Sequence, residues 1–314
     1  MYSYTMIQWL FFFYFYCFGG WCVESVYVSV RTRKLTNRGF LRGPFLPLYG
    51  SGATMMLVVS MPFQDNVFLV YLAGCVGATI LEYVTGVAME ALFKIRYWDY
   101  SNYRFNFQGR ICLGTTLAWG FLTILTTEVI HVPVEHLMFA IPEKVLTGIT
   151  VVVTVIFFAD FSLSFKAAID LRDLLAKMEK TREELVGIHG RLNAIISRAE
   201  ESLEERKDAI AVSVEDLKSS IERALERLKT LAVSKPSAYL ESVKEELSDL
   251  RTKYAVSVEI RNRLSSIRDF FQRDMLRSNP TMTSDTYRES LEELKQGAAR
   301  KDEKKVSYDR TDDI

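Results

Sequence analysis

Apolar residues fill the first half of the chain in long runs that are almost free of charge. Five runs approach or exceed the roughly 20 residues that an α-helix needs to cross the hydrocarbon core of a membrane. They cover residues 6–30, 44–62, 67–93, 111–132 and 145–165. A soluble domain built from such helices would have no polar face to expose to water. The pattern therefore predicts an all-α fold whose first part, residues 1–165, is a polytopic bundle of five transmembrane helices.

The second half follows a different pattern, in which apolar residues recur at intervals of three, four and seven between charged ones. The recurring positions are Leu171, Leu175, Met178, Leu185, Ile188, Leu192 and Ile196, then Leu217, Ile221, Leu225, Leu228 and Leu231, then Val243, Leu247, Leu250, Tyr254, Leu264, Ile267 and Phe271. This spacing places apolar side chains along one stripe of a helix. Proline interrupts the pattern at Pro236 and Pro280, and the register drifts between the breaks.

The tail is accordingly predicted to be a long helical or coiled-coil domain over residues 166–278, followed by a short helix and a disordered end over residues 279–314. The helices could pair within one chain or between chains. We expect antiparallel helices, together with self-association into a homo-oligomer.

Charge divides the chain at the same place. The whole sequence carries 39 Lys+Arg and 39 Asp+Glu, of which residues 1–165 hold only 10 and 9. Nine of those ten basic residues lie in two alternate loops, after the first and the third apolar run, and the tenth is Lys144. By the positive-inside rule these two loops are cytoplasmic. The sequence thus predicts a multi-pass protein of the bacterial cytoplasmic (inner) membrane, with its N-terminus outside and its tail in the cytoplasm.

Acidic residues inside the apolar runs are the first candidates for function. A charge at the centre of a membrane helix costs about 2.5–3.5 kcal/mol even on lenient scales. Glu24 lies near Gly19 and Gly20, while Glu82 and Glu90 share one helix face with Gly86. These carboxylates either line a substrate or ion site or pair with loop arginines such as Arg42 and Arg110. Asp160, near the end of the fifth run, is expected to reach interfacial water.

The stretch NRGFLRGPFLPLYGSG, residues 37–52, joins positive charge to a helix start. Proline is tolerated in the first turn of a helix, and free amides at a helix N-terminus attract anions. Asn37, Arg38 and Arg42 would then help to bind a phosphate or carboxylate. Alternatively, the arginines bind anionic lipid headgroups and set the topology.

The second basic loop, KIRYWDYSNYRFNFQGRICLG, places polar residues among aromatic ones. Tyr97, Trp98, Tyr100 and Tyr103 could form an interfacial belt, but Asp99, Asn102, Asn106 and Gln108 are not typical of one. We expect a structured loop that is partly covered by protein, because irregular backbone at membrane depth needs such cover.

In combination, these residues resemble a known family of bacterial membrane proteins, the CmpB-type putative ABC-transporter type IV. The resemblance covers about residues 5–160 and is carried by GGW with Glu24, by NRGFLRGPFLPLYGSG, by LEYVTG, and by WDYSNYRFNFQGRICL followed by Trp119. The positions that look like family positions are Glu24, Asn37, Arg38, Gly39, Gly43, Pro44, Pro47, Tyr49, Glu82, Trp98, Asp99, Tyr100, Asn106 and Gly109. The resemblance implies transport, with any ATPase on a separate subunit, because the chain has no GxxxxGK[ST] phosphate loop.

Other chemistry has little support in the sequence. The four cysteines, Cys17, Cys22, Cys75 and Cys112, lack metal-ligand spacing, and we expect no metal site and no cofactor. His131 and His136 are expected on the surface of an outer loop. The balanced charges of the tail argue against nucleic-acid binding, which leaves membrane lipids as the expected surroundings.

Three functions remain open from the sequence. The first is a permease or transport subunit with an inward-facing polar site, and we favour it because of the resemblance. The second is an intramembrane enzyme acting on a phosphate-bearing lipid, and the third is a membrane-anchored scaffold that works through its tail. The substrate-binding candidates are Glu24, Asn37, Arg38, Arg42, Tyr49, Glu82, Glu90, Trp98, Asp99, Tyr100, Asn106 and Arg110.

Overall fold

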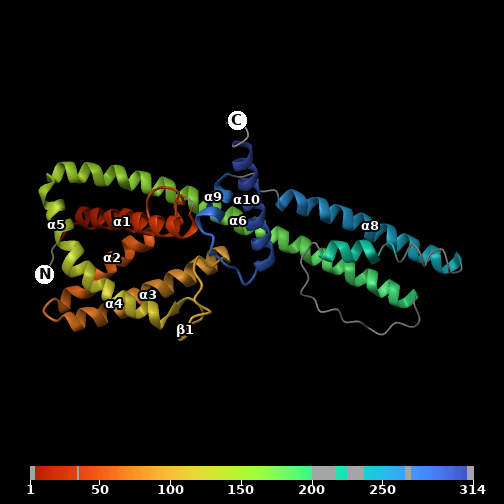
Figure 1. Cartoon of the computed structure of the whole chain (residues 1–314), viewed down its shortest axis with the longest axis horizontal. Helices are drawn as coiled ribbons and strands as arrows, with labels where there is room; N and C mark the ends of the chain where they lie inside the picture. Colours follow the sequence, from red (N-terminus) through yellow and green to blue (C-terminus); the bar gives the residue numbers. More distant parts are fainter. Residues whose placement is uncertain are drawn as a thin grey trace. The chain divides into compact units, whose positions relative to one another are not determined.

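The computed structural model describes residues 4–33, 35–199, 216–224, 226, 237–265 and 270–309. It confirms the all-α class, since the described residues are helical apart from loops and two strands of two residues each. The chain divides into two compact units (Figure 1). Unit 1 comprises Met1–Arg172 and Asp269–Thr286, and unit 2 comprises Asp173–Arg268 and Tyr287–Ile314.

Unit 1 contains the apolar helices. Its elements are α1 (Met6–Thr32), α2 (Pro47–Ser60), the 3-10 turn η1 (Met61–Phe63), α3 (Val67–Phe93), β1 (Asn106–Phe107), β2 (Ile111–Cys112), α4 (Leu113–Ile124), the π-helix η2 (Leu125–Ile130), α5 (His131–Ala140), the first part of α6 (Glu143–Ala199) and α9 (Phe270–Ser278). α4, η2 and α5 follow one another without a break. The predicted end of this helix at residue 132 is therefore wrong, because the helical run continues to Ala140.

Four helices of the described residues are long and apolar enough to span a membrane: Met6–Arg31, Val67–Phe93, Leu113–Ala140 and a window within Glu143–Ile195. The predicted count of five spans is not confirmed. α2 has 14 residues, which make about 21 Å of helix, less than the roughly 30 Å of a hydrocarbon core. It begins at Pro47, three residues later than the predicted start, with Gly43 and Pro44 in the bend before it.

α2 packs between α1 and α3, and α4 packs on α3 (Figure 1). Two glycines, Gly20 and Gly50, allow the α1–α2 approach. A Cβ atom at Gly20 would lie 2.4 Å from Tyr49 Cβ, and one at Gly50 would lie 2.3 Å from Cys17 Sγ. Aromatic side chains fill the remaining space, with Phe12 and Tyr14 buried in two apolar clusters. The membrane helices are thus held by close backbone contact and aromatic packing.

The loop between α3 and α4 is structured. Its last part is a hairpin in which β1 and β2 pair antiparallel. Gly109 occupies the turn with φ +69°, and a Cβ atom there would lie 2.4 Å from Ser101 Oγ. The Gly109 carbonyl accepts a hydrogen bond from the amide of Tyr100 at 2.7 Å. A glycine is required here both by the backbone conformation and by the lack of space.

Part of the tail belongs to unit 1. α9 and residues 279–286 contact the loop after α1 and the loop after α3, through Gly39 and Arg96 respectively. Both basic loops therefore lie at one end of unit 1. We call this end the basic-loop face and define it by residues 35–46 and 94–112.

Unit 2 is a helical bundle that packs within one chain. It contains the second part of α6, a helix over residues 216–224, α8 (Ser237–Ser265) and α10 (Arg288–Asp309). Its core joins Leu185 and Leu192 of α6 with Ile221 and with Leu250 of α8. Arg261 is 1% exposed and donates hydrogen bonds to Glu293 Oε2 and the carbonyl of Met178. Self-association stays a prediction.

Several tail positions of the predicted stripe lie outside the residues that the structure describes. They are Leu225, Leu228, Leu231 and Ile267, together with Pro236 and the end of the chain after residue 309.

Candidate functional site

Three acidic side chains of the membrane helices meet partners at or near the basic-loop face. The first is Glu24, on α1. Its Oε2 accepts a hydrogen bond from Tyr49 of α2 at 2.9 Å, and its Oε1 lies 3.5 Å from Arg38 Nε. Gly20 makes this cluster possible, because it lets the Tyr49 side chain lie against α1. Glu24 is thus bound by a phenol and a guanidinium group that flank the α1–α2 loop.

The second acid, Glu82, is the most buried of the three, with 4% of its surface exposed. Tyr100 donates to its Oε1 at 3.0 Å, and Trp119 donates to its Oε2 at 2.9 Å. The hydroxyl of Thr115 is a further hydrogen-bond partner. Both neighbouring elements, the α3–α4 loop and α4, therefore contribute donors to one carboxylate. Among the described residues, the hydrogen-bond partners of Glu82 are all neutral.

The third acid, Glu90, is bound by two arginines. Arg96 donates to both of its carboxylate oxygens, at 3.0 and 3.1 Å, and Arg110 Nη2 lies 2.8 Å from Oε2. The hydrogen bonds that Arg96 donates to Glu90 are the largest cause that raises the pKa of Arg96 above its ordinary value. This cluster is a charge-assisted network at the end of α3.

The sequence placed Glu82, Gly86 and Glu90 on one face of α3, and the structure packs the α3–α4 loop along that face. Between the two acids, a Cβ atom at Gly86 would lie 3.5 Å from the Trp98 ring and 3.6 Å from Arg110 Cβ. The indole of Trp98 donates to the Arg110 carbonyl at 3.0 Å. Gly86 therefore leaves room for the loop to lie on the helix.

Tyr100 and Asp99 have shifted acidities. Burial raises the pKa of Tyr100, and the charge and hydrogen bond of Glu82 raise it further, so Tyr100 stays a phenol that donates to Glu82. Burial acts to raise the pKa of Asp99, but hydrogen bonds from Ser101 and the charge of Arg96 outweigh it. The pKa of Asp99 consequently lies below its ordinary value, and the carboxylate is ionised at neutral pH.

The start of the second apolar run does bind a carboxylate, but the carboxylate comes from the chain itself. The amides of Arg42 and Gly43 donate to Asp160 Oδ1 and Oδ2 at 3.3 and 2.8 Å. Asp160, expected to reach interfacial water, is instead part-buried in this contact. Asn37 fixes the same loop by accepting from Trp21 at 2.6 Å and donating to the Arg42 carbonyl at 2.6 Å.

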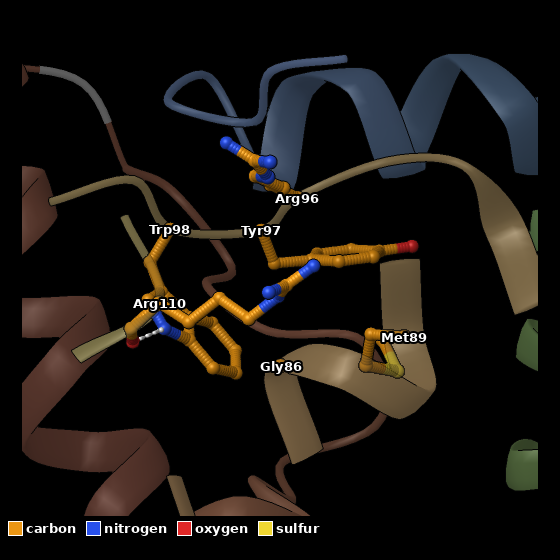
Figure 2. Close-up of a pocket in the computed structure, with 6 residues that line it drawn as sticks. All are labelled: Gly86, Met89, Arg96, Tyr97, Trp98 and Arg110. Atoms are coloured by element: carbon orange, nitrogen blue, oxygen red, sulfur yellow. Dashed lines mark hydrogen bonds between the residues drawn. The ribbon is translucent and has the colours of Figure 1, made fainter. Parts of the chain in front are cut away.

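A small pocket lies beside the third cluster. Its volume is about 10 Å³, room for about one water molecule. Gly86, Met89, Arg96, Tyr97, Trp98 and Arg110 line it. Figure 2 shows the Arg110 side chain extending between Trp98 and Tyr97, with its carbonyl oxygen bonded to the Trp98 indole. The pocket is too small for a substrate in this conformation.

The candidate residues thus form several separate contacts at or near the basic-loop face. They do not line one open cavity. Arg42 turns away from the three acids and pairs with Asp274, at 3.4 Å, rather than with a membrane acid. Asn106 serves the loop itself by donating to the carbonyls of Ser101 and Tyr103.

Some partners were not singled out from the sequence. Trp119 and Thr115 of α4, both bonded to Glu82, lie 37 and 33 positions along the chain from it. Arg96 was considered only as one of the basic loop residues that indicate the membrane topology. His131, expected at the surface, is 1% exposed and accepts or donates hydrogen bonds with the hydroxyls of Tyr4 and Tyr16. Within the described residues there is no group of three or more His, Cys, Asp or Glu side chains that could hold a metal ion.

Residues 11–165 match the family described as Putative ABC-transporter type IV. The resemblance of the N-terminal half to this family is confirmed. The match ends within α6, so the tail of the chain lies outside it. No curated protein and no solved structure matches the sequence. The family match and the apolar helices fit an integral membrane protein related to transport.

Proposed function

We propose that the protein is a permease or a transport subunit whose site faces the cytoplasm. The site combines the carboxylates of Glu24, Glu82 and Glu90 with the arginines of the two basic loops. The match to an ABC-transporter type IV family supports transport. The contacts at the basic-loop face support a site there, because each acid is held by at least one donor from a basic loop.

The environment of Glu82 is the main support for the proposal. Glu24 and Glu90 are paired with guanidinium groups, which already balance their charge. Glu82 is buried against Tyr100 and Trp119 and receives only neutral hydrogen bonds from the residues described. Such a carboxylate can take up a proton or a small cation and release it again, and acids of this kind mark ion and proton pathways in membrane proteins. Glu82 is therefore proposed as the ion-coupled group.

The cytoplasmic orientation rests on charge and on the path of the chain. The basic residues gather in the two loops of one face, which the positive-inside rule assigns to the cytoplasm. α3 is about 40 Å long, and the chain must return from the first loop to the start of α3. α2 and η1, about 25 Å together, provide that return as a short fifth crossing.

The subunit is proposed to act with other chains. The sequence has no phosphate loop for ATP, so ATP-driven transport would need a separate ATPase subunit. Five short crossings are few for a complete permease, and we propose a homo-oligomer in the bilayer. An intramembrane enzyme acting on a phosphate-bearing lipid is the second candidate, and the family match favours transport over it.

The test is ion flux through the purified full-length chain in liposomes. With a pH dye inside and an imposed sodium or potassium gradient, the wild type is expected to move protons faster than empty liposomes do. Glu82→Gln keeps the size of the side chain but removes its charge, and it is expected to lower this flux at least tenfold.

The matched control is Asp65→Asn, the same chemical change in the exposed turn before α3. Its flux should equal that of the wild type. Flux in the wild type no greater than in empty liposomes, or equal flux in Glu82→Gln, would contradict the proposal.

A further inference from the structure

The tail segment Phe270–Asp285 lies outside the family match. It nevertheless contacts the same loop arginines that bind acids of the proposed site. At the first basic loop, Arg38 Nη1 donates to the Ser278 carbonyl at 3.0 Å and to Asn279 Oδ1 at 3.1 Å. The other side of the same guanidinium group faces Glu24. Asn279, 2% exposed, donates in return to the Gly39 carbonyl at 3.1 Å. Arg38 thus joins the first acid of the site to the tail segment.

At the second basic loop, the segment adds a short stretch of antiparallel backbone pairing. The amides and carbonyls of Arg96 and Thr283 exchange two hydrogen bonds, each of 2.8 Å. Ser284 Oγ donates to the Lys94 carbonyl at 2.6 Å. The Arg96 guanidinium, bonded to Glu90, also lies 2.7 Å from the Asp285 carboxylate. Arg96 therefore joins the third acid of the site to the segment, as Arg38 joins the first.

Cation–π and apolar contacts also bind the segment to the basic-loop face. The Arg42 guanidinium carbon lies 4.2 Å from the ring centroid of Phe271 and 4.9 Å from that of Phe270. Met275, 6% exposed, accepts a hydrogen bond on its sulfur from Tyr97. Backbone pairing supplies affinity in such peptide complexes, and side-chain contacts supply specificity. The basic-loop face therefore has the properties of a peptide-binding surface.

The place of the segment in the sequence connects it to unit 2. In the sequence, the segment follows α8 and precedes α10, and both helices belong to unit 2. The segment is therefore continuous in sequence with unit 2 at both of its ends. The segment is short, and hydrogen bonds from both basic loops hold it, while its own side chains Met275, Leu276 and Met282 are buried.

We propose that the basic-loop face is a peptide-binding surface, and that the chain's own segment Phe270–Asp285 occupies it as a closing peptide under the control of unit 2. With the segment bound, Arg38 and Arg96 are fixed between the site's acids and the tail, and the site stays closed. When the segment leaves, both guanidinium groups lose their contacts with it and the loops can open. This gating role rests on the proposed transport function, whereas the binding of the segment does not.

Binding is tested with full-length protein and a labelled synthetic peptide of residues 270–286. The double variant Asn279→Ala/Thr283→Pro, changed only in the tail, loses the Asn279 amide contacts and one hydrogen bond of the backbone pair. It is expected to bind the peptide saturably, at least tenfold more tightly than the wild type, whose surface is already occupied. The control Thr252→Ala/Asn262→Ala changes the same residue types on exposed positions of α8 and should behave like the wild type.

A peptide of scrambled sequence should bind neither protein. Equal binding of the native peptide to the wild type and the double variant, or equal binding of native and scrambled peptides, would overturn the proposed surface. Circular dichroism of the double variant guards against misfolding. Should its helix content fall, the single variant Asp285→Asn, which only weakens the Arg96 contact, must still increase peptide binding.

Gating is tested in the liposome assay. The double variant is expected to show at least threefold faster flux than the wild type, and added native peptide should return the flux to the wild-type rate. Peptide binding without any change in flux would overturn the gating role and keep the binding surface. Absence of flux in every protein, with peptide binding intact, would instead count against the transport function.

Discussion

Single residues explain why the apolar pattern pointed to the acids, whereas Tyr49 and Trp119 were named only through the family resemblance and not as their partners. A carboxylate in an apolar run is conspicuous because it is costly there, and Glu24, Glu82 and Glu90 were chosen for that reason. Their partners are ordinary residues of distant segments. Tyr49 reaches Glu24 from 25 positions away, and Trp119 reaches Glu82 from 37 positions away. Such pairings depend on helix packing, which no local pattern encodes.

The Trp119–Glu82 hydrogen bond gives a prediction at this scale. Trp119→Phe removes the indole donor and leaves a buried carboxylate oxygen without it, so unfolding should require about 1–3 kcal/mol less free energy. Thermal unfolding in detergent measures the change. In a Glu82→Gln background the cost of Trp119→Phe should be clearly smaller. The same cost in both backgrounds would show that Trp119 acts through packing alone.

At the scale of the elements, the long apolar runs correctly predicted α1, α3 and α6, but they misplaced two boundaries. α2 begins only at Pro47, because Gly43 and Pro44 form the bend in which amides bind Asp160. The fourth run continues through η2 to Ala140, and the hydroxyls of Thr123 and Thr127 donate to carbonyls one turn back within it. Glu135 and His131 made that stretch resemble a loop. Polarity alone therefore did not mark a helix end.

The crossing of α1 and α2 gives a prediction for one pair of elements. A Cβ atom at Gly50 would lie 2.6 Å from the carbonyl oxygen of Phe13, a backbone atom that cannot turn aside. Gly50→Ala should therefore destabilise the fold by about 1–3 kcal/mol through overpacking, seen as a lower unfolding temperature. Gly52→Ala is the matched control, since a Cβ atom there meets nothing within 4 Å. An equal loss of stability in both variants would contradict the close crossing.

At the scale of the whole molecule, the sequence correctly divided apolar helices from a charged helical tail, yet it gave no sign that the tail returns to the membrane part. Residues 270–286 read as the end of one helix and a polar turn. Their contacts with Gly39, Arg38 and Arg96 cross up to about 240 positions of sequence. Contacts between residues so far apart in the sequence depend on shape and hydrogen bonding together. The spacing of apolar residues along the tail does not predict them.

The arrangement of the membrane part makes both proposals depend on one feature, the shared side of the two basic loops. If α2 and η1 cross the bilayer, residues 35 and 103 lie on one side, and residues 65 and 143 lie on the other. All four positions are exposed in the structure. Single cysteines there, in a chain whose four native cysteines are replaced, can be labelled with a membrane-impermeant maleimide.

Labelling in intact cells and in inside-out vesicles is therefore the most direct measurement. Cysteines in place of Leu35 and Tyr103 are expected to react only in inside-out vesicles, and cysteines in place of Asp65 and Glu143 only in intact cells. Labelling of position 35 from the side opposite to position 103 would separate the two basic loops and contradict the site, its closing segment and the short fifth crossing together.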